Sequence, residues 1–182
     1  MTTEIICAGF GGQGVLTMGL ILARAGYQQG KNITWYPSYG AEMRGGTANC
    51  NVKLSDEEIG NPYCSRLNLL VAMNEPSVER FEEMLVSGGT LLYNSDMVDE
   101  KRRFRDDIRV IPVPAGTLAF ELQNPQSANV VALGAVAKHL PIFTGDELKS
   151  AVRLYFKDKG KEKYNDLNSR AFDAGYYMEL SP

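Results

Sequence analysis

The spacing of apolar residues along the chain is in some segments that of a strand and in others that of a helix. The order of these segments predicts alternating strands and helices. Residues 3–9 form a short run rich in β-branched residues that ends on glycine. Residues 15–26 then have the length and apolar content of a helix that closes on Gly26. A second strand is expected at 32–37, ended by a proline. This order predicts a βαβ unit with two parallel strands.

From Thr47 to Ser55 the pattern becomes a strict alternation of apolar and polar residues. The apolar positions are Ala48, Cys50, Val52 and Leu54. Such alternation is typical of a half-buried strand in an antiparallel or edge position. We therefore expect a mixed sheet.

The middle of the chain predicts a central strand followed by a helix. Residues 67–73 are apolar throughout, as in a strand that is covered on both faces. Residues 75–89 read as a helix with Pro76 in its first turn, and the glycine pair 88–89 is expected to stop it.

Two more strands and a helical last third complete the pattern. The strands are expected at 90–94 and 108–113, and the charged stretch 96–107 between them is interpreted as a solvated turn or a short surface helix. Helices are expected at 115–123, 126–140 and 144–156, with a final helix behind the charged turn 157–163. Thr144 and Glu147 have the spacing of a capping box at the start of one of these helices.

Strands that alternate with helices, followed by a helical tail, predict an α/β fold. We expect a three-layer Rossmann-like domain with a mixed, mostly parallel sheet and a helical C-terminal third. The 182 residues fit a single domain, residues 1–182.

Charge and hydropathy exclude several classes of partner. The chain has 22 acidic and 19 basic residues and no dense basic stripe with interleaved aromatic residues, so no nucleic acid is expected as a partner. The N-terminal residues do not have the pattern of a signal peptide, and the longest apolar run, 130–137, is far shorter than the roughly 18 residues of a membrane span. We expect a cytoplasmic protein with no membrane association.

The cysteines and the single histidine give little sign of chemistry. Cys7, Cys50 and Cys64 have spacings that match neither a zinc site nor an iron–sulfur motif, so no metal site is expected in this chain. Cys7 and Cys50 are interpreted as small buried hydrophobic residues. His139 stands near a helix end before Pro141, where a solvated or capping role is expected. No catalytic residue is predicted.

Glycines 9, 11 and 14 match the pattern GxGxxG between a strand and a helix. In this context the pattern permits a tight turn, a close approach to a phosphate and anion binding at the helix N-terminus. A dinucleotide site also needs an acidic residue about 20 positions later, and residues 35–38 provide neither a carboxylate nor an arginine. Binding of NAD is therefore disfavoured, and two alternatives stay open: an anion contact, or glycines that only pack the helix against the strand.

The helix that follows the glycine loop and the arginine at position 44 suggest two further contacts. Between Val15 and Ala25 only Thr17 and Arg24 are clearly polar, so this helix needs a cover on two sides, and we expect the sheet on one side and a partner subunit on the other. Arg44 precedes two glycines and either presents a guanidinium to a phosphate or carboxylate or pairs locally in a hairpin.

Three segments together, 9–15, 35–46 and 127–136, resemble the gamma subunit of the 2-oxoacid:ferredoxin (acceptor) oxidoreductases. The form of the second segment is most similar to the subgroup that acts on 2-oxoglutarate, with branched-chain 2-oxoacids next. The resemblance implies oxidative decarboxylation of a 2-oxoacid on thiamine diphosphate, single-electron transfer through [4Fe–4S] clusters to ferredoxin, and transfer of the acyl group to coenzyme A. It also implies that alpha and beta subunits hold the thiamine diphosphate and Mg²⁺ and that a ferredoxin-like subunit holds the clusters.

For this chain the resemblance implies a role in assembly and in binding coenzyme A, and self-association is also expected. In single-chain relatives the matching domain is associated with coenzyme A. The candidate contacts to its phosphates are Gly9, Gly11, Gly12, Gln13, Gly14 and Arg44. Two alternatives remain: a purely structural docking subunit without a ligand, and a free-standing nucleotide-binding oxidoreductase.

Overall fold

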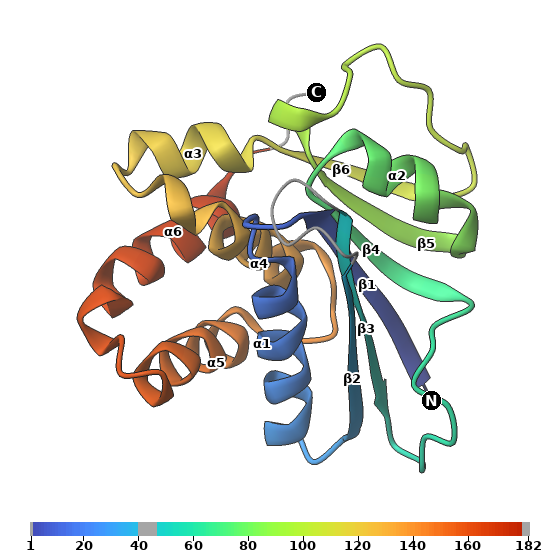
Figure 1. Ribbon diagram of the computed structural model, residues 1–182, viewed down its shortest axis with the longest axis horizontal. Helices are drawn as coiled ribbons and strands as arrows, with labels where there is room; N and C mark the ends of the chain where they lie inside the picture. The colour runs from blue at the N-terminus through green and yellow to red at the C-terminus, as the bar shows by residue number, and fades with distance from the viewer. Residues whose placement is uncertain (1, 40–46, 180–182) are drawn as a thin grey trace.

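The computed structural model describes residues 2–39 and 47–179, and within them six strands form one sheet in the order β2-β3-β1-β4-β5-β6 (Figure 1). The strands are β1 (Thr2–Phe10), β2 (Asn32–Tyr39), β3 (Thr47–Ser55), β4 (Leu67–Ala72), β5 (Leu85–Asn94) and β6 (Arg109–Val113). The pairs β1–β4, β4–β5 and β5–β6 are parallel, whereas β3 pairs antiparallel with both β1 and β2. The expected mixed, mostly parallel sheet is confirmed.

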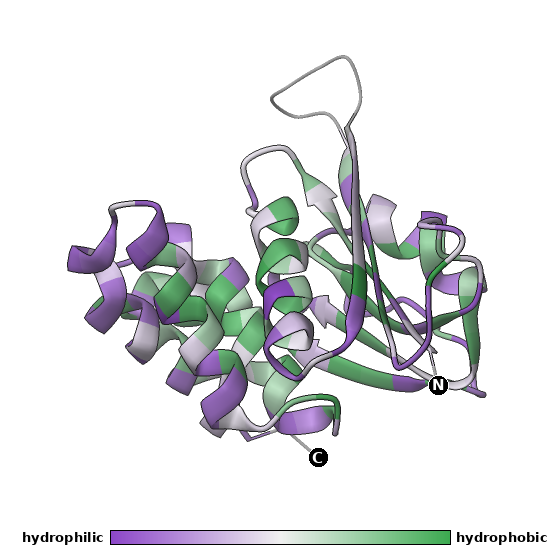
Figure 2. Ribbon diagram, turned by 90° about the horizontal axis from the view of Figure 1, so that it is seen from below, coloured by the Kyte–Doolittle hydropathy of each residue, from purple (hydrophilic) through white to green (hydrophobic). Residues whose placement is uncertain are grey.

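Helices cover both faces of this sheet. They are α1 (Val15–Gln28), α2 (Glu75–Phe81), α3 (Ala115–Glu121), α4 (Ala128–His139), α5 (Gly145–Asp158) and α6 (Asn165–Tyr177). Figure 1 shows α2 on one side of the sheet and α1 and α4 on the other, with α5 and α6 outside them. Apolar residues gather where α1 and α4 meet the sheet, and the outermost helical surfaces are hydrophilic (Figure 2). The expected three-layer fold with a helical C-terminal third is confirmed.

The side chains of β1 alternate between two apolar clusters. Ile5 and Cys7 pack with residues of α1 and α4, whereas Ile6 and Ala8 pack with residues of α2 such as Val78. β1 is therefore buried on both faces, as a central strand of a three-layer fold requires.

The expected βαβ unit is altered by the position of β3. β1 and β2 run in the same direction, but β3 lies between them and pairs with each. β3 is antiparallel, as expected, but it is buried from Ala48 to Ser55 and not half-buried. β2 takes the edge, where a proline inside a strand is tolerated, and therefore continues past Pro37 to Tyr39.

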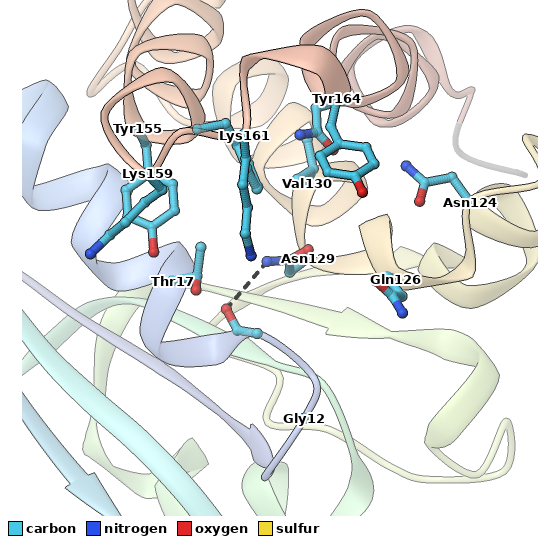
Figure 3. Close-up of a pocket in the computed structure, with 13 residues that line it drawn as sticks. Gly12, Thr17, Asn124, Gln126, Asn129, Val130, Tyr155, Lys159, Lys161 and Tyr164 are labelled. Carbon is cyan, nitrogen blue, oxygen red and sulfur yellow. Dashed lines mark hydrogen bonds between the residues drawn. The ribbon is translucent and has the colours of Figure 1, made fainter.

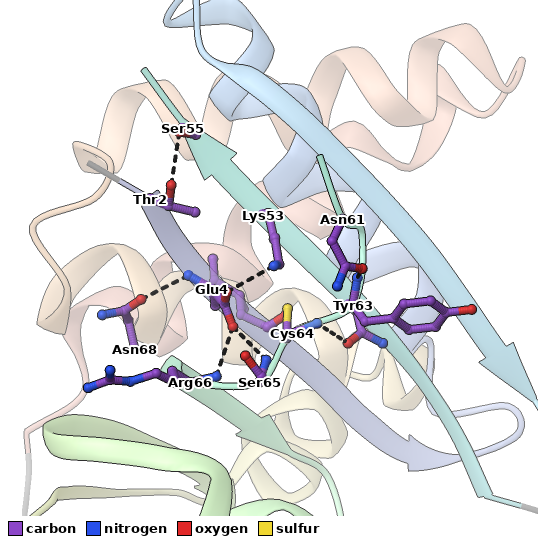
Figure 4. A network of polar contacts seen from close by, with 12 residues as sticks. Thr2, Glu4, Lys53, Ser55, Asn61, Tyr63, Cys64, Ser65, Arg66 and Asn68 are labelled. Atoms are coloured by element: carbon purple, nitrogen blue, oxygen red, sulfur yellow. Dashed lines mark hydrogen bonds and ion pairs between the residues drawn. The ribbon is translucent and has the colours of Figure 1, made fainter. Parts of the chain in front are cut away.

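The polar face of β3 is buried because the segment 56–66 is hydrogen-bonded across it (Figure 4). Asn51 Oδ1 accepts the backbone N–H of Cys64 at 2.9 Å, and Lys53 Nζ lies 2.9 Å from Glu4 Oε1. Glu4 Oε2 also accepts the N–H groups of Ser65 and Arg66, at 2.7 and 2.9 Å. These bonds satisfy groups that burial would otherwise leave unpaired.

The apolar helix α1 is covered on its second side by this same chain. Besides β1, β2 and β3, it contacts α4 and α5. The expectation that a partner subunit covers this side was therefore wrong. The expected end at Gly26 was also wrong: a Cβ there would lie 2.5 Å from Leu54 Cδ2, and α1 continues to Gln28 before Gly30 adopts a φ of 76°.

The helix expected at 75–89 ends early, at Phe81, and β5 already begins at Leu85. The glycine pair therefore lies inside a strand instead of stopping a helix. The charged stretch 96–107 bends back over this region, where Arg102 pairs with both Glu75 and the buried Glu82. It is thus tied to α2 by ion pairs, which the interpretation as a solvated turn did not include.

The three cysteines are buried and free, which agrees with the interpretation of Cys7 and Cys50 as small hydrophobic residues. Burial raises the pKa of the Cys64 thiol to about 12, so this thiol stays protonated at neutral pH. None of the described helices is long and apolar enough to cross a membrane.

Helices α4 and α6 approach each other so closely that their backbones touch. A Cβ at Gly134 would lie 2.0 Å from the carbonyl oxygen of Phe172, and a Cβ at Gly175 would lie 1.9 Å from that of Val131. Any side chain at these two positions must push the helices apart.

We therefore expect Gly134→Ala to lower the free energy of unfolding by about 2 kcal/mol, as overpacking does in other cores, although alanine favours helix formation. Denaturant unfolding followed by circular dichroism measures this. Gly60→Ala is the matched control, because no atom lies within 4 Å of its added Cβ, and it should change the stability by less than about 0.5 kcal/mol. Equal stability of the two variants would contradict the close helix contact.

The pKa of Glu4 gives a pH-dependent prediction. Burial raises the pKa of this carboxyl, but the Arg66 N–H, the Lys53 ammonium and the Ser65 N–H together lower it below its ordinary value of 4.5. At pH values above 4.5, the ordinary pKa, the ionised Glu4 carboxylate therefore adds to the free energy of unfolding. This stabilisation is lost as the pH falls through the lower pKa that Glu4 has in the folded protein.

Glu4→Gln should cost about 2 kcal/mol or more at neutral pH, because it leaves Lys53 buried without its partner. The deficit relative to the wild type should shrink as the pH is lowered from about 6 to about 3. Chemical unfolding at several pH values measures it, with the exposed Glu79→Gln as the control. A deficit that stays constant over this range would refute the assignment.

Candidate functional site

A pocket of about 660 Å³ opens beside the loop that follows β1 (Figure 3). Its volume lies within the range of ligand pockets, roughly 300–1,000 Å³. Its lining comes from the loop and α1 (Gly12, Gly14, Thr17), from the start of α4 and the turn before it (Asn124, Gln126, Asn129, Val130), and from α5, α6 and the turn between them (Tyr155, Phe156, Lys159, Lys161, Tyr164, Asn168). Three segments far apart in the sequence thus meet here.

The loop lies at the carboxyl end of β1, next to that of β4. These two neighbouring parallel strands are followed by α1 and α2, which pack on opposite faces of the sheet. Such a topological switch point is where open α/β sheets bind their ligands.

Gln13 bridges the two strand ends. Its Oε1 accepts the Phe10 N–H at 2.6 Å, and its Nε2 donates to the Met73 carbonyl at 3.0 Å. Asn74 Nδ2 also donates to this Oε1, at 3.3 Å. The Gln13 side chain is therefore committed to holding the loop in place.

The glycines of the loop serve different purposes. A Cβ at Gly9 would lie 2.6 Å from Gln13 Oε1 and 2.9 Å from Val15 Cγ1, so Gly9 permits close packing of helix on strand. Gly12 has a φ of 101° and no atom within 4 Å of an added Cβ, so it faces open space. Gly14, with a φ of 72°, contacts Asn129 so closely that a Cβ would lie 2.4 Å from its Nδ2. Packing and access to a ligand, the two alternatives from the sequence, are thus divided between glycines.

Three helices begin at the pocket wall. α1 and α4 have no side-chain cap and no acidic residue in the first turn, whereas α6 has no side-chain cap but carries Asp166 in its first turn. Helix N-termini carry a partial positive charge and unpaired N–H groups, which favour an anion. The N-termini of α1 and α4 therefore favour an anion at this end of the pocket.

Two lysines add full positive charge. Lys159 and Lys161 lie in the turn after α5, both exposed, and Figure 3 shows Lys161 extending from that turn toward the loop. Of the described residues that line the pocket, none is Asp or Glu. The pocket therefore suits an anionic ligand.

Two buried amides complete the lining. Asn129 and Asn168 are 6% and 5% exposed. Asn129 Nδ2 donates to the Gly14 carbonyl at 3.4 Å, whereas Asn168 Nδ2 has no hydrogen-bond partner within the described part of the chain. A buried donor without a partner costs about 1–3 kcal/mol, so it is a group that a ligand oxygen can satisfy.

Of the residues predicted from the sequence, Gly12 and Gly14 line the pocket, Gly11 and Gln13 belong to the same loop, and Gly9 lies near the end of β1, before that loop. Arg44 lies outside the described residues. Sequence reasoning missed the contributions of Thr17, Asn129, Lys159, Lys161 and Asn168. Of these only Asn129 stood within a segment that carried the family resemblance.

His139 lies at the opposite end of α4 from the pocket. Arg109 Nη1 donates to the His139 carbonyl at 2.8 Å and so caps the helix end. Burial and the nearby charges of Arg109 and Lys138 lower the pKa of the imidazole. Among residues 2–39 and 47–179, no three His, Cys, Asp or Glu side chains are grouped so as to hold a metal ion.

The site lacks a feature of dinucleotide folds. Since β3 stands between β1 and β2, the carboxyl end of β2 lies one strand away from the loop. A carboxylate that binds a ribose would normally stand there, directly beside the first strand. This geometry agrees with the disfavoured binding of NAD.

The family described as Pyruvate ferredoxin/flavodoxin oxidoreductase matches residues 4–178. The chain is 39% identical over 169 residues to the ketoisovalerate oxidoreductase subunit VorA of Methanothermobacter marburgensis, covering 92% of this chain but only 34% of that protein. It is 33% identical over 178 residues to the 2-oxoglutarate synthase subunit KorC of Methanocaldococcus jannaschii, covering 97% of this chain and 93% of that protein. The chain thus spans about a third of the length of VorA.

Two solved structures share the fold. The 2-oxoglutarate:ferredoxin oxidoreductase of Magnetococcus marinus, with 2-oxoglutarate, coenzyme A and succinyl-CoA bound, matches with a TM-score of 0.84 and 27% identity over 96% of this chain and 30% of that chain. The gamma subunit of a keto/oxoacid ferredoxin oxidoreductase from Geobacter sulfurreducens matches with a TM-score of 0.78 and 28% identity over 96% of both chains.

We expect Gln13→Ala to loosen the loop, because it removes the acceptor of the Phe10 N–H and the bridge to Met73. Amide hydrogen exchange should be at least about tenfold faster at Phe10, which corresponds to about 1.4 kcal/mol. Gln28→Ala, at an exposed position near the end of α1, is the control and should leave this exchange rate as it is. Unaltered protection of Phe10 in Gln13→Ala would show that the side chain does not hold the loop.

Proposed function

The chain belongs to the pyruvate ferredoxin/flavodoxin oxidoreductase family, and we propose that it is the gamma subunit of a multi-subunit 2-oxoacid:ferredoxin oxidoreductase. In this proposal the complex decarboxylates a 2-oxoacid oxidatively, passes the electrons to ferredoxin and forms an acyl-CoA. The complex works in the cytoplasm and also contains alpha, beta and ferredoxin-like subunits. This chain has no catalytic residue of its own in the proposal, so activity is measured on the complex.

The proposed substrate is 2-oxoglutarate. KorC, a 2-oxoglutarate synthase subunit, is matched over 93% of its own length, whereas VorA is matched over 34% of its length. A branched-chain 2-oxoacid is the second candidate, because the identity to VorA is 39% against 33% to KorC. Both candidates share the same reaction type.

The observation that carries the proposed role in coenzyme A binding is the electropositive pocket beside the glycine loop. Coenzyme A supplies the thiol that accepts the acyl group, and its diphosphate is an anion that a helix N-terminus and close-approaching glycines can bind. Gly12 would allow the approach, Gly14 would leave room for Asn129 at the edge of the site, and the first N–H groups of α1 would donate to the phosphate oxygens. Gly9, Gly11 and Gln13 would keep the loop in this shape, and Arg44 is proposed as a further contact.

Thiamine diphosphate, Mg²⁺ and the [4Fe–4S] clusters are proposed to belong to the partner subunits. In the part of this chain that the structure describes, no three His, Cys, Asp or Glu side chains are grouped so as to hold a metal ion, and the three cysteines are buried and free. The contribution of this chain is then to complete the complex and to hold coenzyme A. The alternative is a purely structural docking subunit that binds no ligand.

The test is viologen reduction that depends on 2-oxoglutarate, coenzyme A and thiamine diphosphate, by co-expressed partner subunits with and without this chain. Activity should require this chain. In the assembled complex, Gly12→Val should raise the KM for coenzyme A about tenfold, which corresponds to about 1.4 kcal/mol, since it blocks the approach of a phosphate.

Gly30→Val is the matched control, at a glycine that also has open space and a positive φ, of 76°. Size-exclusion chromatography establishes whether each complex assembles. Loss of assembly without a change in KM would support the docking alternative. Activity in the absence of this chain, with every 2-oxoacid tried, would overturn the proposed function.

A further inference from the structure

The wall of the pocket opposite the glycine loop is not needed to bind a diphosphate at the N-terminus of α1. It is built by the turn 159–161 and by the start of α6, and it carries Lys159, Lys161, Tyr164 and Asn168. We propose that this wall recognises the 3′-phosphoadenosine end of coenzyme A and that Lys159 and Lys161 select for the 3′-phosphate. This inference rests on the proposed function, because it assigns a second part of the same ligand to the same pocket.

The charge distribution points to two phosphate positions. One is the loop with the N-terminus of α1, and the other is the pair of lysines that extends from the opposite wall (Figure 3). A ligand with a single phosphate group would not require both. Coenzyme A carries a 5′-diphosphate and a separate 3′-phosphate on the ribose, and two such centres of negative charge match the two walls.

The lysines are available for a ligand. Nearby in the sequence, Lys157 pairs with Glu162 at 4.0 Å. Among the described residues, no such ion pair involves Lys159 or Lys161. No acidic side chain among the described lining residues would repel a phosphate or compete for these ammonium groups. Lys159 Nζ lies 6.0 Å from the centre of the Tyr155 ring, so its contact in the absence of a ligand is an aromatic face and not a carboxylate.

A buried amide belongs to the same wall. Asn168 is 5% exposed, lines the pocket and has an Nδ2 without a partner in the described part of the chain. Such a donor is costly unless a ligand accepts from it. Phosphate, ribose and adenine all offer acceptors, and apolar ligands do not.

Two tyrosine rings provide the surface for the adenine. Tyr155 and Tyr164 both line the pocket, and Tyr164 is 43% exposed. A purine stacks on such rings without a need for specific hydrogen bonds. The combination of cations, a buried amide donor and aromatic faces fits a phosphorylated nucleoside.

The experiment uses the assembled complex and compares coenzyme A with dephospho-coenzyme A, which lacks only the 3′-phosphate. Lys159→Gln and Lys161→Gln should each raise the KM for coenzyme A about tenfold, and the double variant should bring it close to the KM for dephospho-coenzyme A. The KM for dephospho-coenzyme A should change less than about twofold, because that molecule has no group for the lysines to bind. Lys157→Gln removes the same charge from the same region, outside the pocket lining, and is the control.

A binding measurement gives a second readout that does not depend on turnover. Equilibrium dialysis of the complex with adenosine 3′,5′-bisphosphate and with adenosine 5′-phosphate should give tighter binding of the bisphosphate, and the double lysine variant should abolish that preference.

The outcomes separate this inference from the proposed function. If Gly12→Val raises the KM for coenzyme A but the lysine variants leave the ratio of the two KM values as it is, the proposed function stands and the inference is wrong. If the lysine variants raise both KM values equally, the lysines do not read the 3′-phosphate, and the inference is again wrong. If the complex lacks 2-oxoacid-dependent activity and binds no bisphosphate, both are wrong.

Discussion

The backbone contact between α4 and α6 is the constraint on which the pocket depends. At Gly134 and Gly175 each helix fills the space that a side chain of the other would need. Asn129 stands less than two turns before the first of these glycines and Asn168 about two turns before the second. The crossing therefore brings the starts of both helices to the same wall, and the distance between the two buried amides is set by atoms that cannot rearrange.

The other wall is positioned by hydrogen bonds instead of packing. Gln13 joins the ends of β1 and β4 and so holds the loop where the two strands send their helices to opposite faces. One side of the pocket is thus made of glycine backbone and the other of long, exposed side chains. The glycine-backbone side is held in place by hydrogen bonds within the chain, whereas the long side chains on the other side are exposed and can change rotamer around a ligand. This division suits a ligand whose two ends differ in chemistry.

Local signals predicted much of the fold. The capping box of Thr144 and Glu147 is present at the start of α5, and the apolar run at 67–73 is the central strand β4 with a difference of one residue. These two predictions succeeded because the residues that determine each feature are neighbours in the sequence. Gly12 and Gly14 were found at the pocket for the same reason, since the loop motif is contained in six residues.

Predictions failed where distant segments decide the outcome. The polar face of β3 looked exposed because Glu4, the partner of Lys53, is far away in the sequence. The second cover of α1 comes from α4 and α5, more than a hundred residues later. Lys159 and Lys161 were interpreted as part of a charged turn because nothing near them in the sequence indicates that the turn faces the loop at Gly12.

The place of β3 between β1 and β2 also determines when the N-terminal part of the chain can fold. During synthesis, β1, α1 and β2 emerge first, but β1 and β2 have no hydrogen bonds to each other. A nascent chain that has not yet reached Ser55 holds the apolar strand β1 and the more polar strand β2, and the strand that pairs with both does not yet exist. Unpaired strands of this kind are prone to pair with other chains. The protein therefore has unpaired strands early on the ribosome, until β3 is synthesised and pairs with both β1 and β2.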